Sequence, residues 1–202
     1  RQMCIRDRAW GKTLVLVGFG HIGQEIARRA RAFGMRVVAV TRSGRAATEG
    51  PAVGLADETV AVAELASVLP RAQALVLCCP LDDSTRGLIG ARQLALMPPG
   101  ALLVNVARAE VVDEEALYHA LTGGQLGRAA LDVWYSYPKA GQTPAPPSRW
   151  PLHELPNVRG TPHISAITPA LLERRYAFIA HNTMRVAQGP VSYTHLTLPT
   201  KA

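Results

Sequence analysis

Hydrophobic residues along this chain form short continuous runs that alternate with longer stretches of helical periodicity. Apolar runs that end at Gly or Pro are typical of strands buried on both faces of a parallel sheet. Apolar residues spaced three and four apart, with arginines between them, predict amphipathic helices. We therefore expect an α/β fold with strands at residues 13–17, 36–40, 74–79, 101–106, 128–133 and 157–160, and helices at residues 22–33, 57–69, 113–121 and 169–187.

Glycine and proline set the limits of these elements. Gly34 ends the first helix, Pro70 closes the second, Pro80 interrupts the third strand, and a Gly-Gly pair caps the third helix. Residues 135–156 contain many prolines and predict a long loop. Strands that alternate with helices in this order imply a doubly wound parallel sheet covered on both faces.

The composition agrees with a folded domain that has a substantial core. Hydrophobic residues make up 48% of the 202 positions and charged residues 18%, which excludes a chain disordered by composition. No apolar run approaches the roughly 20 residues of a membrane helix, so we expect no membrane partner. No apolar block follows the first arginines as in a signal peptide. Cys78 and Cys79 lie together in an apolar run, which predicts a reduced, buried pair in a cytoplasmic protein.

The two ends of the chain differ from the rest of it. Residues 3–8 can be encoded by ATG TGT ATA AGA GAC AG plus one base, whose reverse complement encodes the Val-Ser-Tyr-Thr-His of residues 191–195. The ends therefore resemble inverted copies of a transposon-end adapter used in sequencing libraries. We expect residues 1–8 and 191–202 to be non-native, residues 9–190 to form the folded domain, and the natural protein to extend beyond both ends.

The formal net charge of +7 raises the question of a nucleic-acid partner. The two terminal segments contribute four basic residues and one acid, so a charge of +4 remains for residues 9–190. The arginines there are spread along the chain, and no basic stripe with an aromatic platform accompanies them. We therefore expect no nucleic-acid partner.

A glycine-rich sequence, Gly-Phe-Gly-His-Ile-Gly at residues 18–23, follows the first predicted strand and opens the first predicted helix. In this context it matches the dinucleotide-binding fingerprint of the Rossmann fold, with a purely structural glycine turn as the alternative. Gly18 would permit the tight turn, Gly20 would let a pyrophosphate approach the backbone, and Gly23 would let the helix pack on the strand. The phosphates would then lie at the helix N-terminus. The residues expected to bind them are Gly18, Gly20, His21, Ile22 and Gly23.

The end of the second predicted strand bears on the choice of cofactor. Folds that select NAD place Asp or Glu there to hold the ribose hydroxyls, but this chain has Thr-Arg-Ser-Gly-Arg at residues 41–45. Two arginines and a serine can bind a 2′-phosphate through charge-assisted hydrogen bonds. The sequence therefore favours NADP over NAD, and the alternative is two solvated surface arginines. The residues expected to contact the ribose or its phosphate are Thr41, Arg42, Ser43 and Arg45.

Several further segments resemble one family. They are Cys-Pro-Leu at residues 79–81, Ser-Thr-Arg-Gly-Leu-Ile at 84–89, Asn-Val-Ala-Arg-Ala-Glu-Val-Val-Asp-Glu at 105–114, Ala-Leu-Asp-Val-Trp at 130–134 and Thr-Pro-His-Ile-Ser at 161–165. Together with residues 14–34, they resemble the nucleotide-binding domain of the D-isomer-specific 2-hydroxyacid dehydrogenases, from about residue 10 to residue 190.

The resemblance implies a Rossmann-type, doubly wound parallel sheet from which the family's substrate domain is largely missing. It implies NADP or NAD as cofactor, a small 2-oxo or 2-hydroxy acid such as glyoxylate or hydroxypyruvate as substrate, and a homodimer. No metal site is expected. The further cofactor-binding residues that we expect are Pro80, Val106, Ala107 and Asp132.

Arg108 follows the fourth predicted strand, at the carboxyl end of the sheet, where α/β folds bind ligands. A planar, permanently charged guanidinium suits the carboxylate and carbonyl of a 2-oxo acid, and by resemblance Arg108 is the family's substrate-binding arginine. The alternative is a surface arginine paired with Glu110 or Asp113. By the same resemblance Asp132 contacts the nicotinamide amide, with a turn or cap acid as its alternative.

His163 resembles the family's acid/base, which protonates the carbonyl oxygen while the reduced nicotinamide delivers hydride. The family pairs this histidine with a glutamate just before a proline, where this chain has Tyr137. A carboxylate would stabilise an imidazolium, whereas a neutral phenol can only hydrogen-bond to it. We therefore expect activity to persist with its acidic-side pH limit shifted down. The competing interpretation is a non-catalytic NAD(P)-binding sensor or corepressor-like module, and a weaker one is another Rossmann enzyme such as an amino-acid dehydrogenase.

Overall fold

The structure of the protein is a computed structural model that describes residues 9–138 and 146–189. The segments expected to be non-native, residues 1–8 and 191–202, lie outside the described residues, as does part of the expected long loop. The chain divides into two compact units, Arg1–Pro162 and His163–Ala202.

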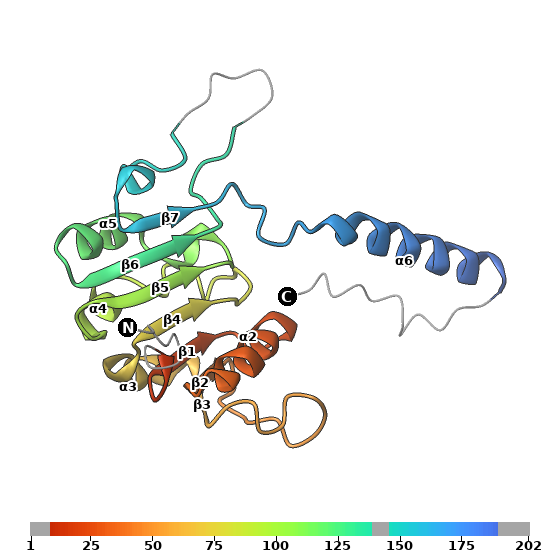
Figure 1. The fold of residues 1–202 in the computed structure, drawn as a ribbon, viewed down its shortest axis with the longest axis horizontal. Coiled ribbons are helices and arrows are strands. Elements are labelled where there is room, and N and C mark those ends of the chain that lie inside the picture. The colour runs from red at the N-terminus through yellow and green to blue at the C-terminus, as the bar shows by residue number, and fades with distance from the viewer. Residues whose placement is uncertain (1–8, 139–145, 190–202) are drawn as a thin grey trace, which may run out of the picture. The chain divides into compact units, whose positions relative to one another are not determined.

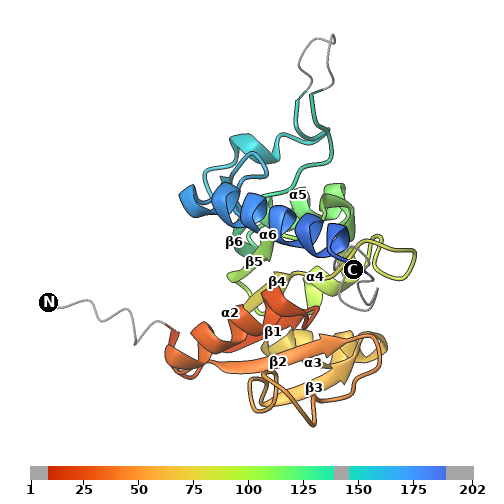
Figure 2. The same cartoon turned by 90° about the vertical axis from the view of Figure 1, so that its right-hand side faces the viewer.

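The first unit is built on a seven-stranded sheet in the order β3-β2-β1-β4-β5-β6-β7, in which every paired strand is parallel (Figure 1). This order confirms the predicted doubly wound sheet, because the chain starts in the middle and winds outward in both directions. β1, β2 and β3 lie side by side in Figure 2. The strands are β1 Thr13–Val17, β2 Arg36–Thr41, β3 Glu58–Ala61, β4 Ala74–Leu77, β5 Ala101–Asn105, β6 Leu126–Leu131 and β7 Val158–Gly160.

Helices cover both faces of this sheet. On one face α2, His21–Ala32, packs Ala27 and Ala30 against a small cluster from β1, β2 and β4. On the other face α3, Leu65–Val68, α4, Ala91–Leu96, and α5, Glu114–Thr122, contribute to the larger core cluster. Short 3₁₀ turns link these elements at Val62–Glu64, Leu69–Arg71, Ala109–Val111 and Leu152–Glu154.

The predicted helix at residues 57–69 is wrong. Its first part is the strand β3, which pairs in parallel register with the edge of β2, and only short helical turns follow. Thr59 and Val60 are β-branched and fit a strand, but apolar residues further on repeat at helical spacing and masked that signal. Pro70 lies inside a 3₁₀ turn and does not close a helix. The structure also contains α4, which has no counterpart among the predicted helices because six residues are too few to show a period.

The second unit contains α6, Pro169–Ala187, which has the bounds predicted from its periodicity. None of its residues is buried, and it exposes large apolar side chains at Leu172, Tyr176, Phe178, Ile179, Met184 and Val186. Within the described ranges, α6 included, no helix combines the length and the apolar character that crossing a membrane would require.

Candidate active site

The turn between β1 and α2 contains three glycines. There is open space beside Gly20, whereas Gly18 and Gly23 are too closely packed to accept a side chain. Gly18 has a φ of +98°, and a Cβ there would lie 2.8 Å from the Cys78 carbonyl group. A Cβ on Gly23 would lie 2.4 Å from the Gly18 carbonyl oxygen. At Gly20, in contrast, an added Cβ would meet no described atom within 4 Å. The three glycines therefore have the geometry expected for the turn, the phosphate approach and the helix packing, respectively.

The N-terminus of α2 is suited to an anion. Gly20 is the N-cap, no side chain caps the helix there, and its first turn contains no acid. His21 and Ile22 lie in that first turn and are exposed. Free N–H groups and the positive end of the helix dipole favour a phosphate at such a position. This arrangement and the open space at Gly20 both fit a dinucleotide pyrophosphate.

A cleft of about 320 Å³ lies at the carboxyl ends of β1, β2 and β4, where the order of the strands reverses. This is the position at which open α/β sheets bind ligands. Four of the predicted cofactor residues line it: Gly18, Thr41, Arg42 and Pro80. Val106 and Ala107 are not among its lining residues. The full lining is Val17, Gly18, Phe19, Val40, Thr41, Arg42, Val62, Cys79, Pro80, Asp82, Ser84 and Thr85.

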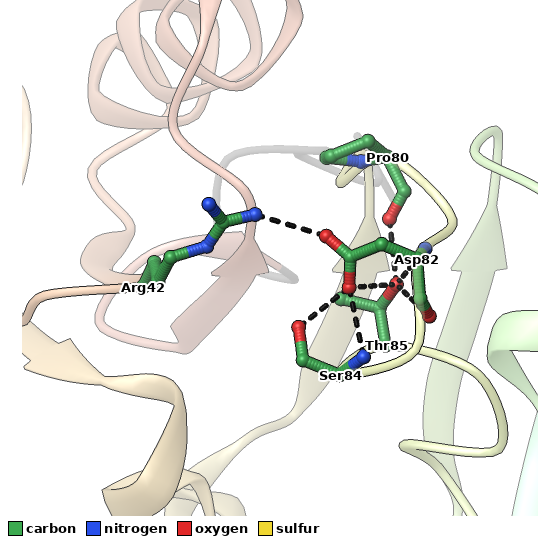
Figure 3. Close-up of polar contacts among 5 residues, drawn as sticks. All are labelled: Arg42, Pro80, Asp82, Ser84 and Thr85. Atoms are coloured by element: carbon green, nitrogen blue, oxygen red, sulfur yellow. Dashed lines mark hydrogen bonds and ion pairs between the residues drawn. The ribbon is translucent and has the colours of Figure 1, made fainter. Parts of the chain in front are cut away.

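The end of β2 forms a turn that is closed by its own side chains. The Gly44 N–H donates to the Thr41 hydroxyl at 3.0 Å, and the Arg45 N–H donates to the Ser43 hydroxyl at 3.4 Å. Arg42 projects across the cleft, and its guanidinium lies 2.9 Å from a carboxylate oxygen of Asp82 (Figure 3). Asp82 is not among the residues predicted for the site, because forty positions separate it from Arg42 and no motif links the two.

Cys78 and Cys79 are free thiols directly after β4, and Cys79 lines the cleft. Cys79 is buried and Cys78 is half-buried, and the Cys78 thiol donates to the Gly18 carbonyl at 3.1 Å. Burial raises the pKa of the Cys78 thiol to about 12 and also raises that of Cys79. Both thiols are therefore protonated at neutral pH, which agrees with the expected packing role and not with a nucleophile.

The loop after β5 presents Arg108 to solvent. Asn105, which is 1% exposed, holds this loop at two points: its side-chain oxygen accepts the Ala107 N–H at 3.0 Å and its amide donates to the Arg108 carbonyl at 2.9 Å. The Arg108 guanidinium donates to the Ala107 carbonyl at 2.7 Å. Among the described residues, Arg108 forms no ion pair with Glu110 or Asp113, so the alternative of a paired surface arginine is not what the structure contains.

Asp132 follows β6 at the same edge of the sheet and is buried. Its backbone N–H donates to the Asn105 carbonyl at 3.1 Å, and its carboxylate accepts the Thr161 hydroxyl at 2.6 Å. Thr161, which follows β7, in turn donates its N–H to the carbonyl of Leu131 at the end of β6 at 2.9 Å. Asp132 therefore ties together the ends of β5, β6 and β7.

Tyr137 and His163 lie on different units. The Tyr137 hydroxyl accepts the backbone N–H of Trp134 at 3.0 Å, and about half of the Tyr137 side chain is exposed. His163 is the first residue of the second unit and follows Thr161 by two positions. It has a φ of +59°, a left-handed conformation that is uncommon outside glycine and is often found at functional positions.

The parallel sheet, the glycine turn and the cleft where the strand order reverses define a Rossmann-class dinucleotide-binding domain. A family model described as D-isomer specific 2-hydroxyacid dehydrogenase, NAD binding domain, matches residues 1–165. The chain belongs to this family, as its motifs predicted.

Comparison with known proteins gives relatives of the same kind. The chain is 37% identical over 192 residues to glyoxylate reductase of Thermococcus gammatolerans, covering 95% of this chain and 53% of that protein. It is 36% identical over 191 residues to D-3-phosphoglycerate dehydrogenase of Methanocaldococcus jannaschii, covering 94% and 34%. The chain therefore spans between about a third and a half of the length of these relatives, in keeping with the expectation that the family's substrate domain is largely missing.

Two solved structures resemble the fold and carry different cofactors. The D-isomer specific 2-hydroxyacid dehydrogenase from Lactobacillus delbrueckii ssp. bulgaricus, in its NAD complexed form, has a TM-score of 0.76 at 29% identity and covers 91% of this chain and 57% of its own. The family member from Xanthobacter autotrophicus Py2, in complex with NADPH and MES, has a TM-score of 0.65 at 32% identity and covers 78% and 46%. The family model and these two structures therefore support a nicotinamide dinucleotide as the cofactor of this domain.

Proposed function

We propose that the protein to which this chain belongs interconverts a small 2-oxo acid and its D-2-hydroxy acid, using NADPH or NADH. The observation that carries the proposal is the placement of two features at one edge of the sheet: a dinucleotide cleft at β1, β2 and β4, and an exposed arginine after β5. The relatives named as glyoxylate reductase and D-3-phosphoglycerate dehydrogenase support this substrate class.

The residues at the cleft would hold the cofactor by its phosphates and ribose. The open backbone at Gly20 and the N-terminus of α2 would bind the pyrophosphate, and the turn after β2 would bind the adenosine ribose. When bound, a reduced nicotinamide supplies the hydride. Asp132 would orient its amide group, by the family resemblance.

Arg108 would bind the substrate. Its guanidinium can donate two parallel hydrogen bonds to a carboxylate and can polarise the adjacent carbonyl. The two Asn105 hydrogen bonds fix the backbone on both sides of Arg108, so the side chain starts from a rigid loop. In the structure the Arg108 guanidinium donates one hydrogen bond to the Ala107 carbonyl. A substrate carboxylate can take the place of this carbonyl as the acceptor.

His163 would move the proton. In the direction of reduction it gives a proton to the carbonyl oxygen as the carbonyl carbon accepts the hydride, so that the carbonyl becomes a hydroxyl. In the direction of oxidation it removes the hydroxyl proton. Tyr137, whose hydroxyl already accepts the Trp134 N–H, stands where the family has a carboxylate and would be at most a neutral partner.

The Tyr137 position is also the observation that favours a second candidate function, a non-catalytic NAD(P)-binding sensor or corepressor-like module. Without a carboxylate partner, the histidine would bind and release its proton with less assistance. Such a module would bind the cofactor and would not turn over any 2-oxo acid.

The test uses the uninterrupted gene product, assayed against glyoxylate, hydroxypyruvate and pyruvate with NADPH and with NADH. We expect turnover, and we expect Arg108→Gln to lower kcat/KM by about a hundredfold or more. Arg92→Gln, which removes an exposed arginine on α4, is the matched control and should leave kcat/KM unchanged. Cofactor binding without turnover on any of these acids would favour the sensor.

We also propose a preference for NADP, a homodimeric state and a cytoplasmic location. The first is supported by the absence of an acid after β2, and the other two by the family resemblance. Kinetic constants for the two cofactors, sedimentation and cell fractionation of the full-length protein would test them; a clear preference for NADH would contradict the first.

A further inference from the structure

The end of β2 has no acidic residue, but the folded structure brings the carboxylate of Asp82 to the cofactor cleft. Arg42 and Asp82 line the same cleft, and the Arg42 guanidinium lies 2.9 Å from Asp82 Oδ2 (Figure 3). The two residues meet because β2 and β4 flank β1 and all three strands end at one edge of the sheet. An arginine that could bind a 2′-phosphate is thus already paired with an anion.

Asp82 is the fixed member of this pair. The backbone N–H of Ser84 donates to Asp82 Oδ1 at 2.9 Å, and the Ser84 hydroxyl donates to the same oxygen. The Asp82 N–H donates at 2.8 Å to the hydroxyl of buried Thr85, which itself donates to the Pro80 carbonyl at 2.8 Å. These bonds hold the backbone and one carboxylate oxygen in place, so that only Oδ2 is left for Arg42.

Arg42 is the exposed member of the pair. Its side chain is 81% exposed, and Asp82 is its one side-chain partner among the described residues. An arginine with this freedom can leave a carboxylate for a phosphate, whereas Asp82 stays where it is. The hydrogen bond from Ser84, together with the Arg42 charge, lowers the pKa of the Asp82 carboxyl, so Asp82 carries its charge at neutral pH.

We propose that Asp82 is a positioning residue for cofactor choice: by holding Arg42 it weakens the binding of the 2′-phosphorylated cofactor relative to the unphosphorylated one. A 2′-phosphate must compete with Asp82 for one guanidinium, whose positive charge Asp82 already partly neutralises. NADH has no 2′-phosphate, so its binding does not depend on the release of Arg42. This inference rests on the proposed dinucleotide function, and it means that Asp82 reduces the preference for NADP that an arginine after β2 would otherwise give.

The test measures dissociation constants of NADPH and NADH for the chain by titration calorimetry. Asp82→Asn keeps an oxygen that can accept the Ser84 bonds and removes the charge. Asp83→Asn is the matched control, because it removes the same charge from an exposed neighbour that has no ion pair among the described residues. Arg42→Gln and the double variant complete a thermodynamic cycle.

We expect Asp82→Asn to tighten NADPH binding by about three- to tenfold and to leave NADH binding within about twofold, since exposed charges interact weakly through water. Asp83→Asn should change neither constant by more than about twofold, and the gain from Asp82→Asn should disappear when Arg42 is Gln. The inference about Asp82 would be overturned, and the proposed function left standing, by any of three results. These are an unchanged ratio of the NADPH and NADH dissociation constants, an equal change in both constants, or a gain that persists in Arg42→Gln. If the unaltered chain binds neither nucleotide, the proposed function fails with it.

Discussion

The three glycines after β1 make different contributions, and single substitutions should separate them. Gly20→Ala adds a methyl group into open space, so it should leave the melting temperature nearly unchanged while obstructing a pyrophosphate at the backbone. Gly23→Ala forces a Cβ against the Gly18 carbonyl oxygen and should cost about 1–3 kcal/mol of stability. Thermal melts and NADH titrations of the two variants provide the check. Loss of stability in Gly20→Ala with binding intact would contradict this division.

Ionisation of the Cys78 thiol should lower the stability of the fold at alkaline pH. Its folded pKa is raised from 9.0 to about 12 by burial, so above about pH 9 the unfolded chain loses this proton while the folded chain keeps it. Stability should therefore fall as the pH rises from about 9 towards 12, by up to about 1.4 kcal/mol per pH unit for this one group. Tyr135 and Cys79, whose pKa values burial also raises, add to the same trend.

Cys78→Ser isolates the contribution of this thiol. A serine can still donate to the Gly18 carbonyl, but it does not ionise in this range. Urea unfolding at pH 8, 9, 10 and 11 should give a shallower decline for Cys78→Ser than for the unaltered chain. Parallel declines would show that the thiol does not titrate with folding.

At the scale of the element, α5 depends on a single cap. Asp113 is its N-cap, and the carboxylate accepts the Ala116 N–H at 2.8 Å. Asp113→Ala should cost about 1 kcal/mol, because one N–H of the first turn loses its acceptor. Asp113→Asn keeps an acceptor and should cost clearly less. Urea midpoints at constant m-value measure both, and equal effects of the two variants would mean that charge, and not the capping bond, is what matters.

The elements show which local signals are reliable. The bounds of β1 and α6 follow directly from the sequence, because a continuous apolar run and a long amphipathic period each have one local solution. β3 does not, because its side chains are only half-buried and its identity depends on hydrogen bonds to the edge of β2. Glu58 shows the same dependence: its partners Arg36 and Arg71 come from either side of it in the chain and meet it only in the folded sheet.

At the scale of the whole molecule, the cofactor cleft belongs to the first unit. Within the described ranges, every strand and both core clusters lie within Arg1–Pro162, whereas α6 in the second unit buries none of its residues. A chain truncated after Pro162 should therefore keep its melting temperature within about 4 °C and should bind NADH as the longer chain does. Scanning calorimetry and titration of the two forms test this; a large loss of stability would show that the second unit supports the first.

The sequence by itself determined the strand–glycine turn–helix unit, the doubly wound sheet and the family, because these depend on local periodicity and on motifs that each occupy one short stretch. Only the tertiary structure decided that residues 58–61 form an edge strand, that Asn105 supports the Arg108 loop through both of its polar atoms, and that Asp82 meets Arg42 across the cleft. The physical reason is that parallel strands distant in the chain end at a common edge, so that polar groups forty residues apart come within hydrogen-bonding distance without leaving any local signal.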